Sequence, residues 1–193
     1  MLKEKLKSYK IILASGSPRR QQFFKDLDLD FEIRLKEIDE IYPENLQAEN
    51  ITNYLAELKS TAFDGEIAEN EIVITSDTLV WLNGKALGKP KDYNDAFDIL
   101  KSMSNATHEV FTSVCFATNA TKNTICDATK VTFKKLSDNE IHYYLENYKP
   151  FDKAGAYGIQ EWIGFVGVCN IKGSYANVMG LPTDKVFAYL NGL

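Results

Sequence analysis

Apolar runs of four or five residues alternate along this chain with segments whose apolar residues recur every three or four positions. The runs rich in β-branched residues are typical of buried strands. Two longer β-rich segments flank a polar turn near residues 119–123, which indicates a long antiparallel hairpin. The predicted strands comprise 10–14, 31–35, 72–75, 79–82, 85–87, 109–117, 124–133 and 165–171.

Predicted helices begin at residues that cap helix N-termini well. Ser17 is a good N-cap and Pro18 suits the first helical position, so a helix should follow them. Ser137 and Glu140 have capping-box spacing and open another helix, to about residue 148. Further helices are predicted at 92–103, at 186–190, and at 47–63, where the expected apolar stripe is Ile51, Tyr54, Leu55, Leu58 and Ala62.

Interleaved strands and helices, with antiparallel hairpins among them, favour an α/β (mixed α+β) fold built on a mixed sheet. One hairpin is predicted by Asn83-Gly84, a strong turn signal between two short strands. The 193 residues suit one compact domain, and 45% hydrophobic residues can form a sizeable core. We therefore expect a single domain over residues 1–193.

Composition and charge exclude several classes of partner. The chain has 22 Lys and Arg against 27 Asp and Glu, a net charge of −5, so a nucleic-acid partner that needs a broad basic face is not expected. There is no run of about 18 apolar residues and no apolar secretory segment, so we expect a cytoplasmic protein without a membrane partner. Three widely spaced cysteines without a C-x-x-C pair predict reduced thiols.

The two histidines are too few for a metal site built on several histidines, and His108 is expected to be structural. Chemistry must then rest mainly on carboxylates, basic side chains and backbone amides. Arg19 and Arg20 open the helix after Ser17, where cations cost roughly 0.3–1 kcal/mol against the helix dipole. A bound phosphate would explain them, because turn amides, hydroxyls and guanidinium groups would converge on it. The alternative, two ordinary surface arginines, stays open.

Three more positions are candidates for substrate contacts. Asp77 follows the strand predicted at 72–75, and a carboxylate at a strand end can hold Mg²⁺ or orient water. Lys89, pinned by Pro90, is able to reach a phosphate. Gln160, in a glycine-containing loop, offers both a donor and an acceptor to a base edge. For each, an ordinary turn or loop residue is the alternative.

Six segments in this order, covering essentially the whole chain, resemble the Maf family of nucleoside triphosphate pyrophosphatases. They are I-L-A-S-G-S-P-R-R (12–20), S-D-T-L-V (76–80), N-G-K-A-L-G-K-P (83–90), T-H-E-V-F-T (107–112), D-K-A-G-A-Y-G-I-Q (152–160) and G-S-Y-A-N-V-M-G-L-P (173–182).

The resemblance implies an elongated, twisted mixed sheet flanked by helices, with a central nucleotide cleft as in inosine triphosphatase-like folds. It implies cleavage of a nucleoside triphosphate to the monophosphate and pyrophosphate, supported by Mg²⁺ or Mn²⁺. By matching position, the resemblance implies that Asp77 is the catalytic proton acceptor and that Glu40 and Asp77 lie at the metal. It implies phosphate contacts for Ser15, Lys59 and Lys89. The base preference would be set by Arg19, Thr78 and Gln160.

The sequence also resembles one branch of that family. Pro-Arg-Arg, Asp-Thr and Ile-Gln are similar to the branch acting on dTTP and UTP, whereas the 7-methyl-GTP branch carries Trp, Gln and Glu at those places. Ser76, Leu58 and Asn105 depart from the usual Ala, Glu and Gly. Two alternatives stay open: a non-catalytic nucleotide-binding regulator linked to cell division, and a pyrophosphatase for other non-standard triphosphates. A homodimer is compatible with the sequence but no segment requires it.

Overall fold

The computed structural model describes residues 2–193, and their contacts divide them into two compact units. Unit 1 holds the chain up to Asp77, Thr112–Asp127 and Gly180–Leu193, and unit 2 holds Thr78–Phe111 and Ala128–Met179. The expectation of one domain over the whole chain stays a prediction. Three long strands contribute residues to both units: β3 (Glu71–Leu82), β5 (Thr107–Ala117) and β6 (Lys122–Phe133).

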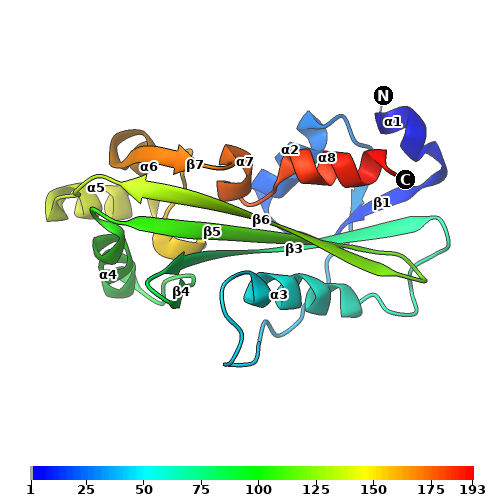
Figure 1. Ribbon diagram of the computed structural model, residues 1–193, viewed down its shortest axis with the longest axis horizontal. Coiled ribbons are helices and arrows are strands. Elements are labelled where there is room, and N and C mark those ends of the chain that lie inside the picture. The colour runs from blue at the N-terminus through cyan, green and yellow to red at the C-terminus, as the bar shows by residue number, and fades with distance from the viewer. Residues whose placement is uncertain (1) are drawn as a thin grey trace. The chain divides into compact units, whose positions relative to one another are not determined.

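Seven strands form one mixed sheet, which confirms the predicted fold class. The shorter strands are β1 (Lys10–Leu13), β2 (Phe31–Ile33), β4 (Lys85–Leu87) and β7 (Val168–Lys172). Their order is β2-β1-β3-β5-β6-β7, with β4 paired to β3 (Figure 1). β1 runs parallel to β2 and β3, whereas β4 and β7 run antiparallel to β3 and β6 respectively. Parallel and antiparallel pairs thus coexist, as interleaved helices and hairpins require.

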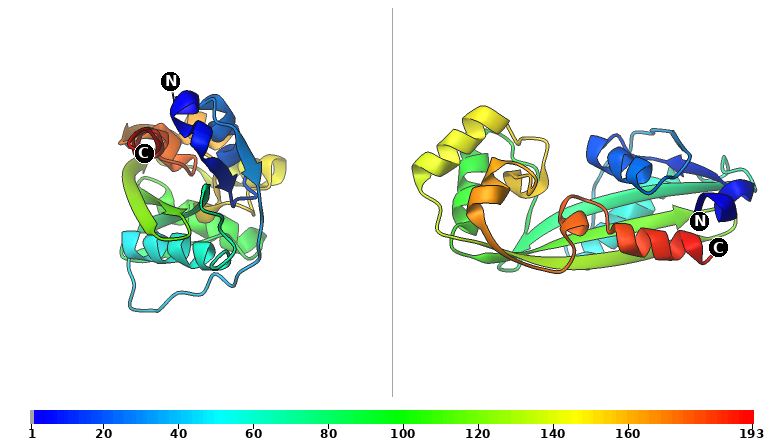
Figure 2. Two further views of the ribbon diagram at one scale, coloured as in Figure 1. Left: turned by 90° about the vertical axis from the view of Figure 1, so that its right-hand side faces the viewer. Right: turned by 90° about the horizontal axis from the view of Figure 1, so that it is seen from above.

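Unit 1 has helices on both faces of its strands (Figure 1 and Figure 2). On one face, Ile74 of β3 packs with Phe24 and Val186. On the other face, Val73 packs with Phe63, because successive strand residues point to opposite faces. The helices of this unit are α1 (Leu2–Lys5), the 3₁₀ turn η1 (Leu6–Ser8), α2 (Pro18–Asp26), α3 (Glu49–Thr61) and α8 (Thr183–Asn191).

Unit 2 has its own apolar core around the last residues of β3. Val80 belongs to one buried cluster with Leu100, Tyr144 and Ile163, which come from three different helices. Apolar side chains from each of these helices are removed from water there, which stabilises the unit. Its helices are α4 (Tyr93–Met103), α5 (Asp138–Tyr148), the 3₁₀ turn η2 (Ala154–Ala156), α6 (Trp162–Gly167) and α7 (Tyr175–Val178).

The local signals in the sequence are confirmed. Ser17 caps α2 by accepting from the backbone of Arg20, and Pro18 is its first residue. The capping box that opens α5 is present in full. Asn83 and Gly84 turn the β3–β4 hairpin with φ of 50° and 78°, the positive values that a type I′ turn requires.

Most predicted strands agree with the structure to within two residues at each end, and larger differences occur in two places. β3 does not end before Ser76: it continues through Asp77 to Leu82, so Asp77 lies within a strand. The segment predicted as a strand from Phe165 is helical up to Gly167, and β7 begins only at the next residue. The first error lies at the polar residues after Thr75, which the pattern took as the end of a strand. The second concerns a short apolar run, for which periodicity does not distinguish a helix from a strand.

The buried face of α3 also differs from the predicted stripe. Tyr54 is 38% exposed, whereas Ala56 and the polar residues Thr52 and Ser60 are buried. Both hydroxyls donate to backbone carbonyls one turn earlier in the helix, so they can be buried without loss of hydrogen bonds. Ile51 and Leu55 of the predicted stripe are buried as expected, but the pattern considered apolar residues alone and therefore missed the polar part of this face.

Candidate active site

Asp77 points from β3 toward α3 and contacts a lysine there. Its side chain is 11% exposed, and Oδ1 lies 2.7 Å from Lys59 Nζ. Thr75, two residues earlier and on the same strand face, donates from Oγ1 to the carbonyl of Ala56 at 2.6 Å. These two contacts hold α3 against β3 and bring Lys59 to the carboxylate.

Lys59 also contacts the second predicted acidic residue. Its Nζ lies 3.2 Å from Glu40 Oε1, so one ammonium group lies between two carboxylates. The Lys59 side chain is 17% exposed and that of Glu40 is 49% exposed, so the cluster is open on the Glu40 side. The structure thus brings together Asp77, Glu40 and Lys59, which the sequence analysis could connect only through the family resemblance.

Arg20 belongs to the same region of unit 1, whereas the sequence analysis had considered it only as part of a phosphate site together with Arg19. Its Nε donates to the carbonyl of Gly180 at 2.8 Å and its Nη1 to the carbonyl of Ser76 at 3.1 Å. Burial lowers the pKa of the guanidinium, while the negative charges of Asp77 and Glu40 oppose that shift. Arg20 is therefore an anchored cation near both carboxylates and not an ordinary surface residue. The signal for it in the sequence was the pair of arginines at the start of a helix, where cations are unfavourable unless an anion is bound.

Ser15 and Arg19 lie around the N-terminus of α2. Ser15 is 6% exposed, and its Oγ accepts from the backbone N–H of Ser17 at 3.3 Å. Arg19 is half-buried in the first turn of the helix. The first amides of a helix and a nearby guanidinium group are suited to an anion.

Unit 2 carries the other three predicted residues. Thr78 follows Asp77 on β3 and is half-buried, Lys89 is exposed, and Gln160 is half-buried. The loops of Lys89 and Gln160 are joined, because the Gly155 N–H donates to the carbonyl of Gly88 at 3.0 Å.

Gly155 also lies against β3. Its φ is +68°, and a Cβ there would lie 2.8 Å from Val80 Cγ2, so glycine is required on both counts. Val80 is two residues beyond Thr78, so the loop that leads to Gln160 is packed on the same strand as Thr78.

His108 has the structural role that the sequence predicts. It is buried at the start of β5, and its Nε2 shares a 2.7 Å hydrogen bond with the hydroxyl of Tyr157. Burial lowers the pKa of His108 to about 4, so the ring is neutral at pH 7. A neutral buried ring held by one hydroxyl is suited to packing rather than to proton transfer.

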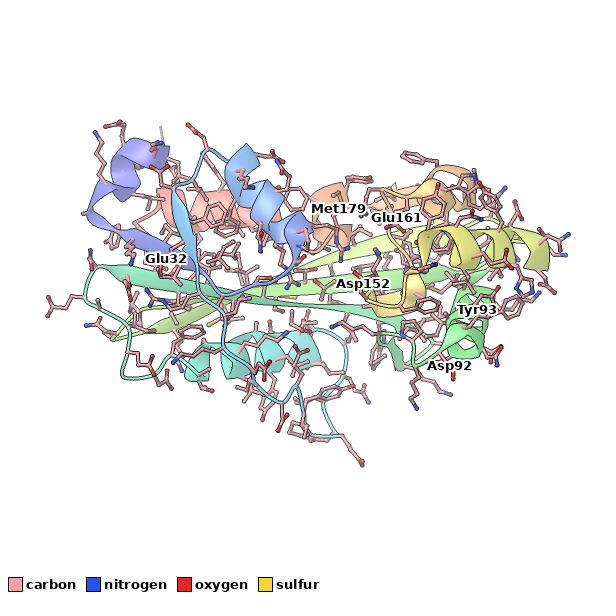
Figure 3. All side chains as sticks on the ribbon, turned by 180° about the vertical axis from the view of Figure 1, so that it is seen from behind. Glu32, Asp92, Tyr93, Asp152, Glu161 and Met179 are labelled. Carbon is pink, nitrogen blue, oxygen red and sulfur yellow. The ribbon has the colours of Figure 1, made fainter. Side chains whose placement is uncertain are left out.

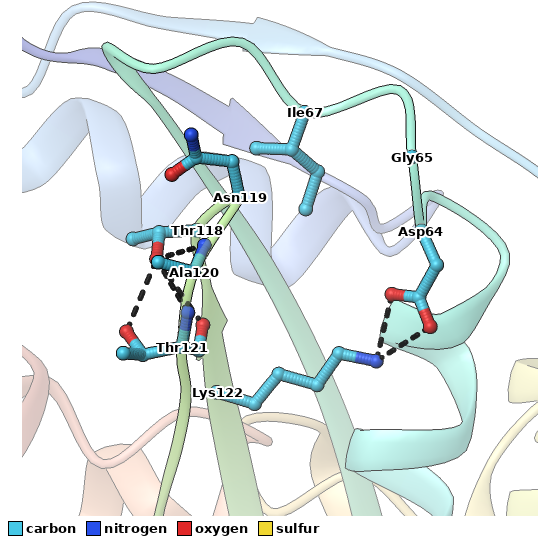
Figure 4. Close-up of a pocket in the computed structure, with 8 residues that line it drawn as sticks. All are labelled: Asp64, Gly65, Ile67, Thr118, Asn119, Ala120, Thr121 and Lys122. Carbon is cyan, nitrogen blue, oxygen red and sulfur yellow. Dashed lines mark hydrogen bonds and ion pairs between the residues drawn. The ribbon is translucent and has the colours of Figure 1, made fainter.

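Within residues 2–193, no group of three or more His, Cys, Asp or Glu is arranged to hold a metal ion. No helix in that range is long and apolar enough to cross a bilayer. A pocket of about 460 Å³ lies elsewhere in unit 1, at the tip of the β5–β6 hairpin (Figure 4). One side of it is closed by an ion pair of 2.7 Å between Lys122 and Asp64. It is lined by residues other than the predicted site residues.

A protein-family model described as "Maf-like protein" matches residues 10–193. The chain belongs to this Maf-like family. Three relatives named "dTTP/UTP pyrophosphatase" are similar over nearly their whole lengths. The one from Flavobacterium johnsoniae is 70% identical over 100% of both chains. Those from Flavobacterium psychrophilum and Parabacteroides distasonis are 66% and 46% identical over 98% and 97% of this chain, and each alignment covers 97% of the relative.

One solved structure shares the fold of the Maf-like chain. The Ham1 protein of Staphylococcus aureus aligns over 95% of this chain and 98% of its own, with a TM-score of 0.53. Sequence identity is 17%, so this likeness concerns the fold alone. The family resemblance inferred from the six sequence segments is thus confirmed, and so is the fold class that it implied.

Proposed function

We propose that this Maf-family protein is a nucleoside triphosphate pyrophosphatase that hydrolyses dTTP and UTP to the monophosphate and pyrophosphate. Full-length similarity to relatives named "dTTP/UTP pyrophosphatase" supports the substrates. The observation that carries the chemistry is the contact of Lys59 with both Asp77 and Glu40. It combines a proton acceptor with the positive charge that a triphosphate requires, and it does so without a covalent nucleophile.

In this reaction Asp77 accepts the proton of the attacking water. The water oxygen forms a bond to the α-phosphorus, and the bond from that phosphorus to the bridging oxygen breaks, so pyrophosphate leaves with the electron pair. Lys59 and Arg20 supply positive charge close to Asp77. Arg20 is held by two backbone carbonyls, so its charge is already in place before the substrate binds.

The carboxylates fit a hard divalent cation. Mg²⁺ is commonly held by one or two carboxylates together with water and substrate phosphates, and the two here are Glu40 and Asp77. We propose that these two side chains would hold Mg²⁺ or Mn²⁺. When bound, the cation neutralises phosphate charge and polarises the phosphorus–oxygen bonds.

The remaining residues bind and select the nucleotide in this proposal. Ser15 and Lys89 contact phosphates together with Lys59, whereas Arg19, Thr78 and Gln160 set the base preference. Gln160 carries both an amide donor and a carbonyl acceptor, which suits the Watson–Crick edge of uracil or thymine. These roles rest on the match of this sequence to the family segments.

The first test is pyrophosphate release with Mg²⁺ from dTTP, UTP, CTP, GTP and 7-methyl-GTP, by the wild type and by Asp77→Asn. Release from dTTP and UTP that falls at least about 100-fold in the variant would support the proposal. Release only from other bases would keep the chemistry and overturn the base preference. Nucleotide binding without release would favour a regulator instead.

We further propose that the enzyme acts as a single domain in the cytoplasm and that its one small-molecule partner is a nucleoside triphosphate. Light scattering coupled to gel filtration distinguishes a monomer from a homodimer. The mass expected for one chain is 21.8 kDa.

A further inference from the structure

Gln160 lies in a short segment of unit 2 that is fixed on both sides by one tyrosine hydroxyl. The Gly158 N–H donates to Tyr144 Oη at 3.0 Å, and Tyr144 Oη in turn donates to Glu161 Oε2. Tyr144 belongs to α5 and is fully buried. Its hydroxyl therefore joins the backbone two residues before Gln160 to the side chain one residue after it.

The Glu161 carboxylate is held from its other side by a lysine. Lys153 Nζ lies 3.2 Å from Glu161 Oε1, and the two side chains are 11% and 19% exposed. Glu161 is labelled in Figure 3, next to α6. Because both oxygens have partners, the carboxylate has one orientation rather than several, and the backbone that carries it is restrained as well.

Close packing removes the remaining freedom of this segment. A Cβ added at Gly158 would lie 2.8 Å from Glu161 Cδ, so the carboxylate fills the space beside that glycine. A Cβ added at Gly164 would lie 1.8 Å from the carbonyl oxygen of Ile159, so α6 contacts the backbone immediately before Gln160. Ile159 itself is 4% exposed. Few backbone conformations of residues 158–161 are compatible with these contacts.

We propose that Tyr144 is a positioning residue which, through Gly158 and Glu161, orients Gln160 and thereby sets selectivity for the pyrimidine base. This inference rests on the proposed function, in which Gln160 reads the base. Burial raises the pKa of Tyr144, and its hydrogen bond to Glu161 raises it further, so the hydroxyl stays protonated and donates. A residue that reads hydrogen bonds must be held within about 0.5 Å of its productive position, which is what this arrangement provides.

The test measures kcat/KM for UTP and CTP in four proteins: wild type, Tyr144→Phe, Gln160→Ala and the double variant. Loss of the hydroxyl leaves the Gly158 N–H and the Glu161 carboxylate without their shared partner. We expect the UTP-to-CTP ratio to fall about tenfold in Tyr144→Phe. In the Gln160→Ala background the same change should alter that ratio less than about twofold, because a positioning residue acts only through the group that it positions.

Tyr143→Phe is the matched control, since it removes an exposed hydroxyl from the neighbouring position of α5. It should leave the ratio unchanged. Equal ratios in wild type and Tyr144→Phe, or an effect that persists in full without Gln160, would overturn the inference. A merely structural role would lower kcat/KM for both nucleotides alike and would overturn it too.

Two further measurements distinguish a failure of this inference from a failure of the variant to fold and from a failure of the proposed function. If Tyr144→Phe does not fold, Glu161→Gln replaces it, because the amide keeps its volume but loses the charge that Lys153 pairs with. If the wild type releases no pyrophosphate from any nucleotide, the proposed function fails. In that case the affinities for UTP and CTP are measured by calorimetry in the same four proteins. The ratio of the two affinities then replaces the ratio of kcat/KM values.

Discussion

Lys59 Nζ lies 2.7 Å from Asp77 Oδ1, although the two residues are 18 positions apart and belong to a helix and a strand. Lys59 also contacts Glu40, which comes from an irregular segment far earlier in the chain. A single ammonium group thus organises two carboxylates, and it is the centre of the candidate site in unit 1. Removal of the positive charge of Lys59 should therefore impair the reaction.

Lys59→Met tests whether the reaction depends on the positive charge of Lys59. The variant keeps most of the length of the side chain but removes the charge, so kcat/KM for UTP should fall about 100-fold through lost charge stabilisation. Circular dichroism should show a retained fold. The control is Lys7→Met, which removes an exposed lysine that forms an ion pair with Glu4 at the surface. Activity of Lys59→Met within twofold of the wild type would contradict the assignment.

Arg20→Lys tests the anchoring of the second cation. A lysine cannot donate to the carbonyls of Ser76 and Gly180 in the forked geometry of a guanidinium group. We expect a loss of about 1–3 kcal/mol in the free energy of unfolding, because partly buried carbonyls lose their donor. Urea unfolding measures it, with Gln22→Ala on the exposed face of the same helix as control. Equal stability of Arg20→Lys and wild type would show that these two bonds are dispensable.

Glu71 should make the protein sensitive to acid. Arg34 holds it with two hydrogen bonds of 2.9 and 3.1 Å and lowers its pKa from 4.5 to about 2. Because the folded-state pKa is depressed, this stabilisation is present above about pH 4.5 and is lost as the pH falls toward 2. Glu71→Gln should unfold more easily at pH 6 and show a flatter dependence between pH 4.5 and 2.

Thermal unfolding at a series of pH values checks this, and Glu69→Gln, an exposed glutamate two residues away, is the control. Parallel curves for Glu71→Gln and the wild type over that range would contradict the prediction.

His108 should contribute a second, separate dependence on pH. Burial lowers its pKa from 6.5 to about 4, so the unfolded chain binds a proton more readily between those values. Stability should therefore fall as the pH drops from about 6.5 to 4, with no change from this group above 6.5. His108→Phe keeps an aromatic ring beside Phe133 and should lose this dependence.

The control for His108→Phe is His142→Asn, which changes an exposed histidine. This control should keep the fall in stability that comes from His108. A variant His108→Phe whose melting temperature still drops between pH 6.5 and 4 as in the wild type would show that other groups cause the dependence.

Local hydrogen bonding explains which elements could be predicted. The start of α2 at Ser17 and Pro18, the capping box of α5 and the turn at Asn83 each depend on residues within four positions of one another. Even a departure from the family pattern fits this rule. Asn105 replaces a usual glycine and has a φ of +56°, a left-handed conformation that asparagine tolerates better than most residues.

Packing between distant segments explains the errors. The pattern ended a strand before Asp77, but β3 runs on to Leu82, since its residues stay buried and paired beyond Ser76. Likewise, Phe165 to Gly167 is helical because Gly164 lets α6 approach the backbone of Ile159 closely. Neither contact is visible in the local sequence.

The sequence alone determined most of the strands and the longer helices, the fold class and the family, because these follow from periodicity, caps and collinear segments. It also supplied the residue types of the candidate site. Only the tertiary structure decided that Lys59 lies between Asp77 and Glu40, that Arg20 is anchored beside them, and that Tyr144 restrains the segment of Gln160. The physical reason is that a hydrogen bond or ion pair across many residues depends on how whole elements pack, which no local pattern encodes.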